Sequence, residues 1–271
     1  MVLSRPSELM HFLATLGVSP KKRLSQNFLI DGNILRNILK EANIQAGDLV
    51  LEIGAGPGAL TEVLLEKGAE VVAVEKDPIF AQALKRFPSL EVFAGDIRDF
   101  PLDSLQRKAK VVSNLPYHLT TPILAMLAPR HDLFSTVTVM VQEEVARRMT
   151  AYVSTSEYGS LTLFLQFYAT LHYAFKVSKR CFYPQPKVDS AIVTLTLKKP
   201  PLASPEKFFD MVHTAFKGRR KTVRKTLGEV YGVEKILSLL KDPHCRPENL
   251  SLDDFLFLYH HTREEDGSKN W

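Results

Sequence analysis

The feature that most restricts the fold of this chain is an alternation of short apolar runs with helical stretches between residues 48 and 150. The nearly continuous apolar runs lie at Leu49–Ile53, Val71–Val74, Leu90–Phe93, Val111–Ser113 and Val137–Val141. Stretches with helical periodicity fall near residues 59–67, 78–86, 121–128 and 143–150. Strands that are apolar throughout are typical of a parallel sheet covered by helices on both faces. The alternation therefore predicts an α/β fold with a mainly parallel sheet.

The segments that flank this region predict an N-terminal extension and one further strand. Residues 7–16 carry apolar side chains at the spacing of a short amphipathic helix, within an extension over residues 1–47. Another helix is predicted around Leu161–Tyr168. In Ala191–Leu197, threonines alternate with apolar residues, which predicts a half-exposed strand that could run antiparallel and close one edge of the sheet.

A domain boundary is predicted at Lys198-Lys199-Pro200-Pro201, because prolines in succession end regular structure. Beyond it, Ser204-Pro205-Glu206 has the residues of a helix start, and the rest of the chain has helical periodicity. We therefore predict a sheet domain over residues 1–199 and a small all-helical domain over residues 202–271.

The composition excludes several classes of protein. Of the 271 residues, 45% are hydrophobic and 24% are charged, which is ordinary for a globular protein and excludes disordered, collagen-like and coiled-coil chains. The two cysteines, Cys181 and Cys245, cannot form a disulfide framework and lack metal-ligand spacing. No stretch approaches the length of a membrane span. We expect a cytoplasmic protein with reduced thiols, no metal site and no membrane partner.

A glycine-rich turn, Gly54-Ala55-Gly56-Pro57-Gly58, follows the first apolar run and leads into a helical stretch. Glycines allow close backbone approach to a ligand and positive φ angles. The G-x-G-x-G spacing matches neither the dinucleotide fingerprint nor a phosphate-binding loop. Alone, the turn could be only a tight connection.

Two acids follow the next two apolar runs. Glu75 ends the second run, where a carboxylate can accept both hydroxyls of a ribose, and Asp96 follows the third, where it can accept from the exocyclic amine of adenine. Each acid alone could be a helix cap. With the glycine turn, they place three ligand-facing features at the carboxyl ends of consecutive strands, which predicts a pocket for an adenosine-containing ligand.

The sequence Asn114-Leu115-Pro116-Tyr117 at the end of the fourth run indicates what this pocket does. The lone pair of an adenine amine is delocalised into the ring. Two acceptors, the Asn114 side chain and the Leu115 carbonyl, could bind its hydrogens and localise that lone pair. Pro116 would fix the backbone and Tyr117 would stack on the base. Such a site works by positioning and electrostatic stabilisation.

These features together resemble the S-adenosylmethionine-dependent adenine-N6 methyltransferases. Further matching segments are Gln26-Asn27-Phe28-Leu29, Met140-Val141-Gln142, Tyr158-Gly159, Phe182 to Ser190, and Arg219-Arg220-Lys221-Thr222. The whole set is similar to the ribosomal RNA adenine dimethyltransferases, and within them to the small-subunit family whose loss confers kasugamycin resistance. The resemblance covers roughly residues 20–260.

The resemblance implies a Rossmann-like class I methyltransferase with seven strands, the last antiparallel, followed by a small helical domain. It implies that S-adenosyl-L-methionine is bound or bordered by Asn27, Leu29, Gly54, Gly56, Glu75, Asp96 and Asn114. It also implies that Asn114 and Leu115 hold the target N6, and that Phe182 stacks on the flipped adenine beside Tyr117. Without the family, Phe182 reads as a loop aromatic anchored to the core. Leu115 favours an RNA target, because DNA-modifying relatives usually carry a second proline there.

The basic residues of the second domain predict an RNA-binding surface. The formal net charge is only +5, but the nine residues from 217 to 225 contain six cations and no acid, namely Lys217, Arg219, Arg220, Lys221, Arg224 and Lys225. Such a run is often a solvated helix face. A cluster of one sign along a helix also suits RNA phosphates, which position a substrate without reading its sequence. Gly218 could interrupt this helix.

The leading hypothesis is therefore a monomeric enzyme that dimethylates two adjacent adenosines near the 3′ end of small-subunit ribosomal RNA, with the small ribosomal subunit as its partner. Three alternatives remain. One is a large-subunit adenine methyltransferase of the macrolide-resistance type, and another is a non-catalytic nucleic-acid-binding relative. The third is an NAD-dependent oxidoreductase, which leaves Asn114–Tyr117 unexplained.

Overall fold

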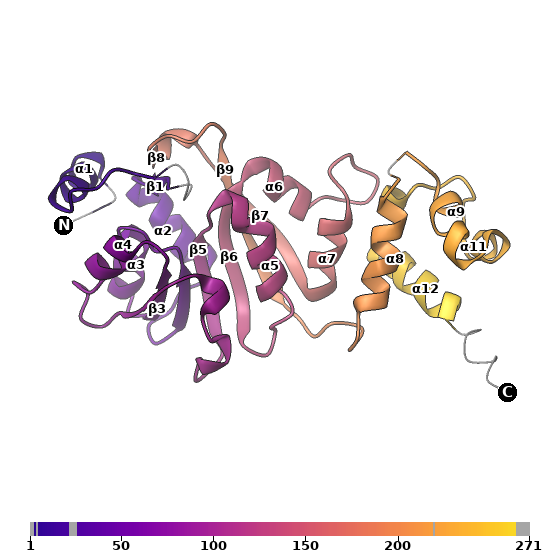
Figure 1. Cartoon of the computed structure of the whole chain (residues 1–271), viewed down its shortest axis with the longest axis horizontal. Helices are drawn as coiled ribbons and strands as arrows, with labels where there is room; N and C mark the ends of the chain where they lie inside the picture. Colours follow the sequence, from indigo (N-terminus) through magenta and orange to yellow (C-terminus); the bar gives the residue numbers. More distant parts are fainter. Residues whose placement is uncertain (1–2, 4, 22–25, 219, 264–271) are drawn as a thin grey trace. The chain divides into compact units, whose positions relative to one another are not determined.

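The computed structural model describes residues 3, 5–21, 26–218 and 220–263 (Figure 1). The chain divides into two compact units, each made of two segments. The first comprises residues 1–146 and 169–198, and the second comprises residues 147–168 and 199–271. The second crossing between units lies at the predicted boundary near residue 199. The chain first passes into the second unit after residue 146, which the apolar pattern did not predict. Residues 147–168 therefore belong to the same unit as the C-terminal helices.

The first unit contains a seven-stranded sheet in the order β4-β3-β2-β5-β6-β9-β7. Its strands are β2 (Leu49–Ile53), β3 (Glu70–Glu75), β4 (Glu91–Ala94), β5 (Ala109–Asn114), β6 (Phe134–Gln142), β7 (Ala169–Val177) and β9 (Ser190–Leu197). The pairs among β2 to β6 are parallel, whereas β9 is antiparallel to both β6 and β7. This confirms the predicted mainly parallel sheet with its last strand antiparallel.

Two details of this sheet differ from the sequence prediction. Strand β9 does not close an edge, because β7, which was not predicted, pairs with its outer side. Nor is β9 half-exposed: Thr194 is only 9% exposed, and its hydroxyl lies 3.1 Å from that of Thr138 on β6. Because buried threonines can satisfy each other across a strand pair, their alternation does not require a solvated face.

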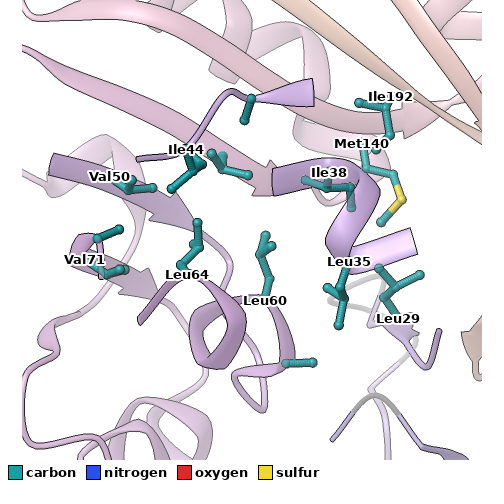
Figure 2. Close-up of a cluster of buried hydrophobic side chains, with 14 of the residues drawn as sticks. Leu29, Leu35, Ile38, Ile44, Val50, Leu60, Leu64, Val71, Met140 and Ile192 are labelled. Carbon is teal, nitrogen blue, oxygen red and sulfur yellow. The ribbon is translucent and has the colours of Figure 1, made fainter. Parts of the chain in front are cut away.

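One face of the sheet is covered by α2 (Gly32–Glu41), α3 (Ala59–Glu66) and α4 (Pro78–Leu84). Figure 2 shows Leu35 and Ile38 of α2 with Leu60 and Leu64 of α3, packed near Val50 of β2. Helix α5 (Thr120–Leu127) packs on β6, and α6 (Glu143–Met149) follows that strand. Asp31 caps α2 by accepting from the backbone N–H groups of Asn33 at 2.9 Å and Ile34 at 3.2 Å.

The N-terminal residues add a helix and a small second sheet to this unit. Helix α1 (Pro6–Thr15) lies where the amphipathic spacing predicts it. Strand β1 (Phe28–Leu29) pairs antiparallel with β8 (Phe182–Tyr183), so that Leu29 lies opposite Phe182. The described residues of this unit also form the 3₁₀ helices η2 (Ile97–Asp99), η3 (Leu102–Ser104), η4 (Tyr117–Leu119) and η5 (Lys179–Cys181).

The second unit is helical in the part that the structure describes. Its elements are α7 (Ser160–Tyr168), α8 (Glu206–Phe216), α9 (Val223–Thr226), α10 (Gly228–Tyr231), α11 (Val233–Leu239), η6 (Pro247–Asn249) and α12 (Leu252–Arg263). Aromatic rings of α7 and α8 form its core, with Phe167 stacked on Phe208 at a centroid distance of 5.3 Å. This packing explains why α7 belongs with the later helices. No described helix is long and apolar enough to cross a membrane.

Candidate active site

A pocket of about 900 Å³ opens at the carboxyl ends of β2, β3, β4 and β5 in the first unit. These ends contribute Gly54, Glu75, Asp96 and Asn114 to its lining, and Asn27 closes another side. Parallel α/β sheets bind ligands at this edge. The fold therefore brings together residues that are separated by up to 87 positions in the chain.

Of the three glycines in the turn, only Gly54 lines the pocket. Gly54 lines the pocket and donates its backbone N–H to the Val74 carbonyl at 2.8 Å. Gly56 has a φ of +55°, and a Cβ there would lie 3.2 Å from the Phe28 ring. Any larger residue at position 56 would therefore be strained in its backbone and crowded. Gly56 does not border the main pocket, and it acts on the site through its N–H.

Glu75 is held by the backbone around it. Its Oε2 accepts from the Gly56 N–H at 2.6 Å and its Oε1 accepts from the Asp77 N–H at 2.7 Å. The side chain is buried, and burial raises the pKa of this carboxyl above its ordinary value. A carboxylate has about four lone-pair positions, so these two bonds leave capacity for ligand hydroxyls.

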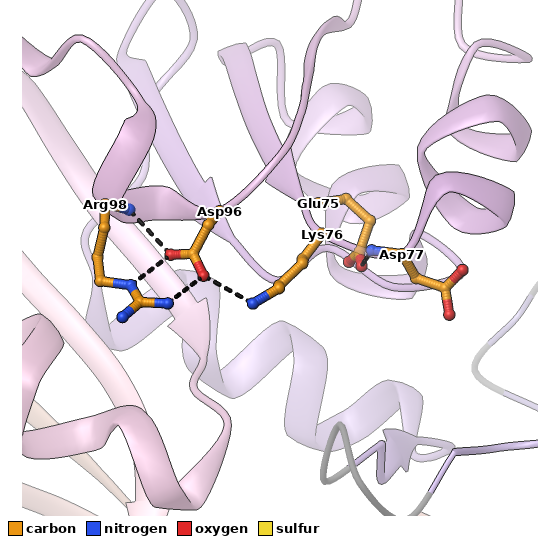
Figure 3. Close-up of polar contacts among 5 residues, drawn as sticks. All are labelled: Glu75, Lys76, Asp77, Asp96 and Arg98. Carbon is orange, nitrogen blue, oxygen red and sulfur yellow. Dashed lines mark hydrogen bonds and ion pairs between the residues drawn. The ribbon is translucent and has the colours of Figure 1, made fainter.

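Asp96 is surrounded by cations (Figure 3). Arg98 donates its Nε to Oδ1 at 2.9 Å and its terminal nitrogen to Oδ2 at 2.7 Å, while its backbone N–H donates to Oδ1 at 3.0 Å. Lys76 Nζ lies 2.9 Å from Oδ2. The Arg98 hydrogen bonds lower the pKa of Asp96 far below its ordinary value. Arg98 and Lys76 were not predicted as site residues, although Lys76 directly follows Glu75 and Arg98 lies two residues after Asp96.

The Asn114–Tyr117 segment faces the same pocket. Asn114 donates its Nδ2 to the Asn27 carbonyl at 3.1 Å, which turns the amide so that its Oδ1 can accept from a ligand. Leu115 donates its backbone N–H to the Met140 carbonyl at 3.2 Å, which restrains the residue whose own carbonyl was predicted as the second acceptor. The Tyr117 hydroxyl lies 2.8 Å from Ser190 Oγ, and burial raises the pKa of Tyr117.

The N-terminal side of the pocket is anchored by Asp77. Lys21 Nζ lies 2.7 Å from Asp77 Oδ2, and Gln26 Nε2 donates to the same oxygen at 3.1 Å. Gln26 in turn accepts the Lys21 N–H at 2.7 Å. Asp77 therefore ties the residues that enter β1 to the end of β3. The sequence did not predict this anchor, because Lys21 and Gln26 each lie more than 50 positions from Asp77 in the chain.

A smaller pocket of about 410 Å³ adjoins the first and shares Phe28, Gly54 and Asn114 with it. Leu29, a predicted cofactor residue, lines this smaller pocket and not the larger one. Its wall includes Glu52, which is 2% exposed and accepts from the Thr61 hydroxyl at 2.6 Å. Burial raises the pKa of Glu52 to about 8. Sequence analysis did not single out this acid, which lies within an otherwise apolar run.

Phe182 is not at the predicted place. The side chain is 3% exposed and belongs to the buried cluster that includes Leu29, Leu35 and Met140, and it does not border the main pocket. A ring that is only 3% exposed presents almost no surface on which a base could stack. The structure therefore places Phe182 as a core anchor of β8, which was the alternative interpretation of its sequence context.

The basic cluster lies in the second unit. Lys217, Arg220, Lys221 and Lys225 are exposed and Arg224 is half-buried, whereas Arg219 lies outside the described residues. The run is not one helix: α8 ends at Phe216 and α9 begins at Val223, with a turn around Gly218 between them. Val223 and Leu227 are fully buried, so the cations project from a segment whose apolar side is anchored.

Neither metal ligation nor a disulfide is present in the part of the chain that the structure describes. No three His, Cys, Asp or Glu side chains gather there as a metal would require. Cys181 and Cys245 are both free thiols.

Comparison with known protein families gives a match over most of the chain. Residues 17–261 match the family described as "Ribosomal RNA adenine dimethylase". The "Ribosomal RNA small subunit methyltransferase A" of Protochlamydia amoebophila is 55% identical over 276 residues, covering 96% of this chain and 97% of the relative. The protein of the same name from Chlamydia abortus is 50% identical over 275 residues, covering 96% and 98%.

Solved structures agree with this assignment. A dimethyladenosine transferase from Plasmodium falciparum superimposes with a TM-score of 0.76 at 28% identity, covering 89% of this chain and 98% of that chain. The 23S rRNA methyltransferase ErmE superimposes with a TM-score of 0.70 at 26% identity, covering 88% and 100%. Both similarities extend over nearly all of the compared chains.

Proposed function

Because this chain belongs to the ribosomal RNA adenine dimethylase family, we propose that it transfers methyl groups from S-adenosyl-L-methionine to N6 of two adjacent adenosines near the 3′ end of small-subunit ribosomal RNA. One observation carries this proposal. The Asn114 amide, oriented by its bond to the Asn27 carbonyl, lines the same pocket as Glu75 and Asp96. Acceptors for an amine thus lie beside acceptors for a nucleoside.

The residues of the pocket fit S-adenosyl-L-methionine. A buried carboxylate at Glu75 suits the two hydroxyls of a ribose. Asp96, which accepts four hydrogen bonds from Arg98 and Lys76, would bind the exocyclic amine of an adenine in exchange for one of these donors. Buried Glu52 adds a carboxyl in the adjoining space. When bound, this cofactor supplies an activated methyl group.

The chain's own residues would act on the target adenine by binding and orientation. Asn114 Oδ1 and the Leu115 carbonyl would each accept one N6 hydrogen, which directs the nitrogen lone pair away from the ring. Tyr117 would hold the base by stacking. Such positioning can supply much of a rate enhancement without a strong base. An adenine reaches such a pocket only after it leaves the helical stack.

We propose the small-subunit RNA as substrate on the basis of curated relatives that are 44–55% identical and are named small-subunit methyltransferases. ErmE, which is named for 23S rRNA, is 26% identical. The basic cluster of the second unit would bind RNA phosphates.

We further propose that the enzyme acts as a monomer in the cytoplasm.

The test is methyl transfer from labelled cofactor to three substrates: unmethylated small subunits, large subunits and naked ribosomal RNA. We expect label in the small-subunit RNA. Label confined to the large-subunit RNA would contradict the proposal. Sedimentation of the purified enzyme would test the monomeric state.

A further inference from the structure

The hydroxyl of Tyr117 is bonded to a residue from a distant strand. Tyr117 starts η4 directly after Asn114-Leu115-Pro116, and its half-buried ring lines the main pocket. Its hydroxyl lies 2.8 Å from the hydroxyl of Ser190, which is fully buried at the start of β9. The ring that would stack on the target base is therefore fixed at its far end.

Ser190 is itself held firmly. It lies opposite Gln142 of β6 and Val177 of β7, so both neighbouring strands constrain it. The preceding residue, Asp189, accepts the Glu143 N–H at its carbonyl at 3.0 Å and the Lys179 N–H at its carboxylate at 2.9 Å. Lys176 Nζ lies 2.9 Å from both the Asp189 and the Glu143 carboxylates. The start of β9 is thus a fixed point from which Ser190 can hold another group.

We propose that Ser190 is a positioning residue that holds the Tyr117 ring in place for the second of the two methyl transfers in particular. This inference rests on the proposed function. Without the bond to Ser190, the Tyr117 ring can rotate about its side-chain torsions. The backbone of η4 would still place it near the pocket, but not in one orientation.

The second transfer depends more on this ring than the first, because of the hydrogens on N6. Before the first transfer the amine carries two hydrogens, one for Asn114 Oδ1 and one for the Leu115 carbonyl. The first transfer forms the N6–methyl bond, breaks the sulfur–methyl bond of S-adenosyl-L-methionine to leave S-adenosylhomocysteine, and releases one proton from N6, so the monomethylated amine has one hydrogen left. One acceptor then has no partner on the base. Stacking on Tyr117 must supply more of the orientation in the second step.

The experiment compares Ser190→Ala, Tyr117→Phe and the double variant with the wild-type enzyme. Small subunits are methylated for short times, and the RNA is digested to nucleosides for quantification of mono- and dimethyladenosine by mass spectrometry. Loss of one hydrogen bond predicts a fall of about three- to tenfold in the rate of the second transfer. We expect a smaller fall in the first, so monomethyladenosine should accumulate. The affinity for S-adenosyl-L-methionine, measured by calorimetry, should not change.

The double variant and a matched control separate positioning from general destabilisation. Both single variants remove the same bond, so the double variant should be no worse than either. Thr194→Val removes another buried hydroxyl pair on β9, the 3.1 Å contact with Thr138, which does not border the pocket. This control should lose stability without a change in product ratio. If Ser190→Ala does not fold, Tyr117→Phe tests the same bond.

A wild-type product ratio in a folded Ser190→Ala enzyme would overturn the inference. So would an equal change in Thr194→Val, or effects of the two single variants that multiply in the double variant. Failure of the proposed function looks different, because the wild-type enzyme would then form no methylated adenosine in small subunits.

Discussion

Glu75 and Asp96 are both carboxylates of one pocket, yet their surroundings shift their pKa values in opposite directions. Burial raises the pKa of Glu75, whose partners are backbone N–H groups. The hydrogen bonds from Arg98 lower the pKa of Asp96. Arg98 and Lys76 therefore keep Asp96 ionised and fixed as an acceptor.

Arg98→Gln should make cofactor binding sensitive to acid. In the wild type, the lowered pKa keeps Asp96 ionised well below the ordinary value of about 3.9. In the variant, the largest cause of the lowered pKa is lost while Lys76 and the backbone N–H of residue 98 remain, so the pKa of Asp96 should rise toward its ordinary value and affinity for S-adenosyl-L-methionine should fall as the pH drops from about 6 toward 4. Calorimetric titrations across this range measure the effect. Arg130→Gln is the control, since Arg130 pairs with Asp132 on the surface and does not line the pocket. Parallel pH profiles for wild type and Arg98→Gln would contradict the assignment.

Glu75→Gln should weaken both the fold and the cofactor site. Glutamine keeps the shape but offers one acceptor oxygen to the two N–H groups of Gly56 and Asp77. One buried donor then loses its partner, which costs about 1–3 kcal/mol of unfolding free energy. Denaturant unfolding and cofactor titration measure the two losses. Glu66→Gln, at an exposed position, is the control. Unchanged stability and affinity would refute the described role of Glu75.

Asn114→Ala should remove methyl transfer and leave RNA binding intact. The variant loses an oriented acceptor for the target amine, and loss of one such preorganised group lowers kcat by about 10²–10³. RNA affinity, measured by filter binding, should stay within about twofold, because phosphate contacts dominate it. Full activity in this variant would exclude Asn114 from the reaction.

The basic cluster, which extends from the end of α8 into α9, acts as one element in the proposed binding of RNA. Neutralising Arg220, Lys221 and Arg224 together should weaken RNA binding, and the slope of log K against log salt should flatten by about one unit per lost contact. Neutralising the exposed Lys40, Lys67 and Lys85 changes the net charge equally and is the control. A wild-type affinity and salt slope in the first triple variant would show that this segment does not contact RNA.

Strands with a nearly continuous apolar run could be predicted from sequence, and strands with an interrupted or very short run could not. The runs from Leu49–Ile53 to Val137–Val141 are nearly continuous and all are strands, including β4 at one edge of the sheet. Strand β7 lies at the other edge, where His172 and Lys176 interrupt its apolar pattern and hide it. The pair β1–β8 has only two residues in each strand, which is too short for any periodicity.

The candidate site was predictable where the chain places polar residues at strand ends. Glu75, Asp96 and Asn114 follow this rule, and all three line the pocket. Their partners were not predictable, since Ser190 bonds to Tyr117 across 73 positions and reads as an ordinary strand residue. Phe182 was misplaced because a motif position does not reveal whether a ring faces a pocket or the core.

The molecule as a whole combines a nucleoside pocket in one unit with a concentrated positive charge in the other. The net charge of +5 would not by itself indicate an RNA partner. The location of the cations and the family membership carry that argument. Together they support the proposal that the enzyme binds RNA by its phosphates and acts on an exposed adenine.

The most direct test maps the modified nucleotides. Unmethylated small subunits are incubated with the enzyme and S-adenosyl-L-methionine, and fragments of their RNA are analysed by mass spectrometry. We predict N6,N6-dimethyladenosine at two adjacent positions near the 3′ end, and none with Asn114→Ala. Methyl groups at other atoms, at isolated adenosines, or only in large-subunit RNA would contradict the account.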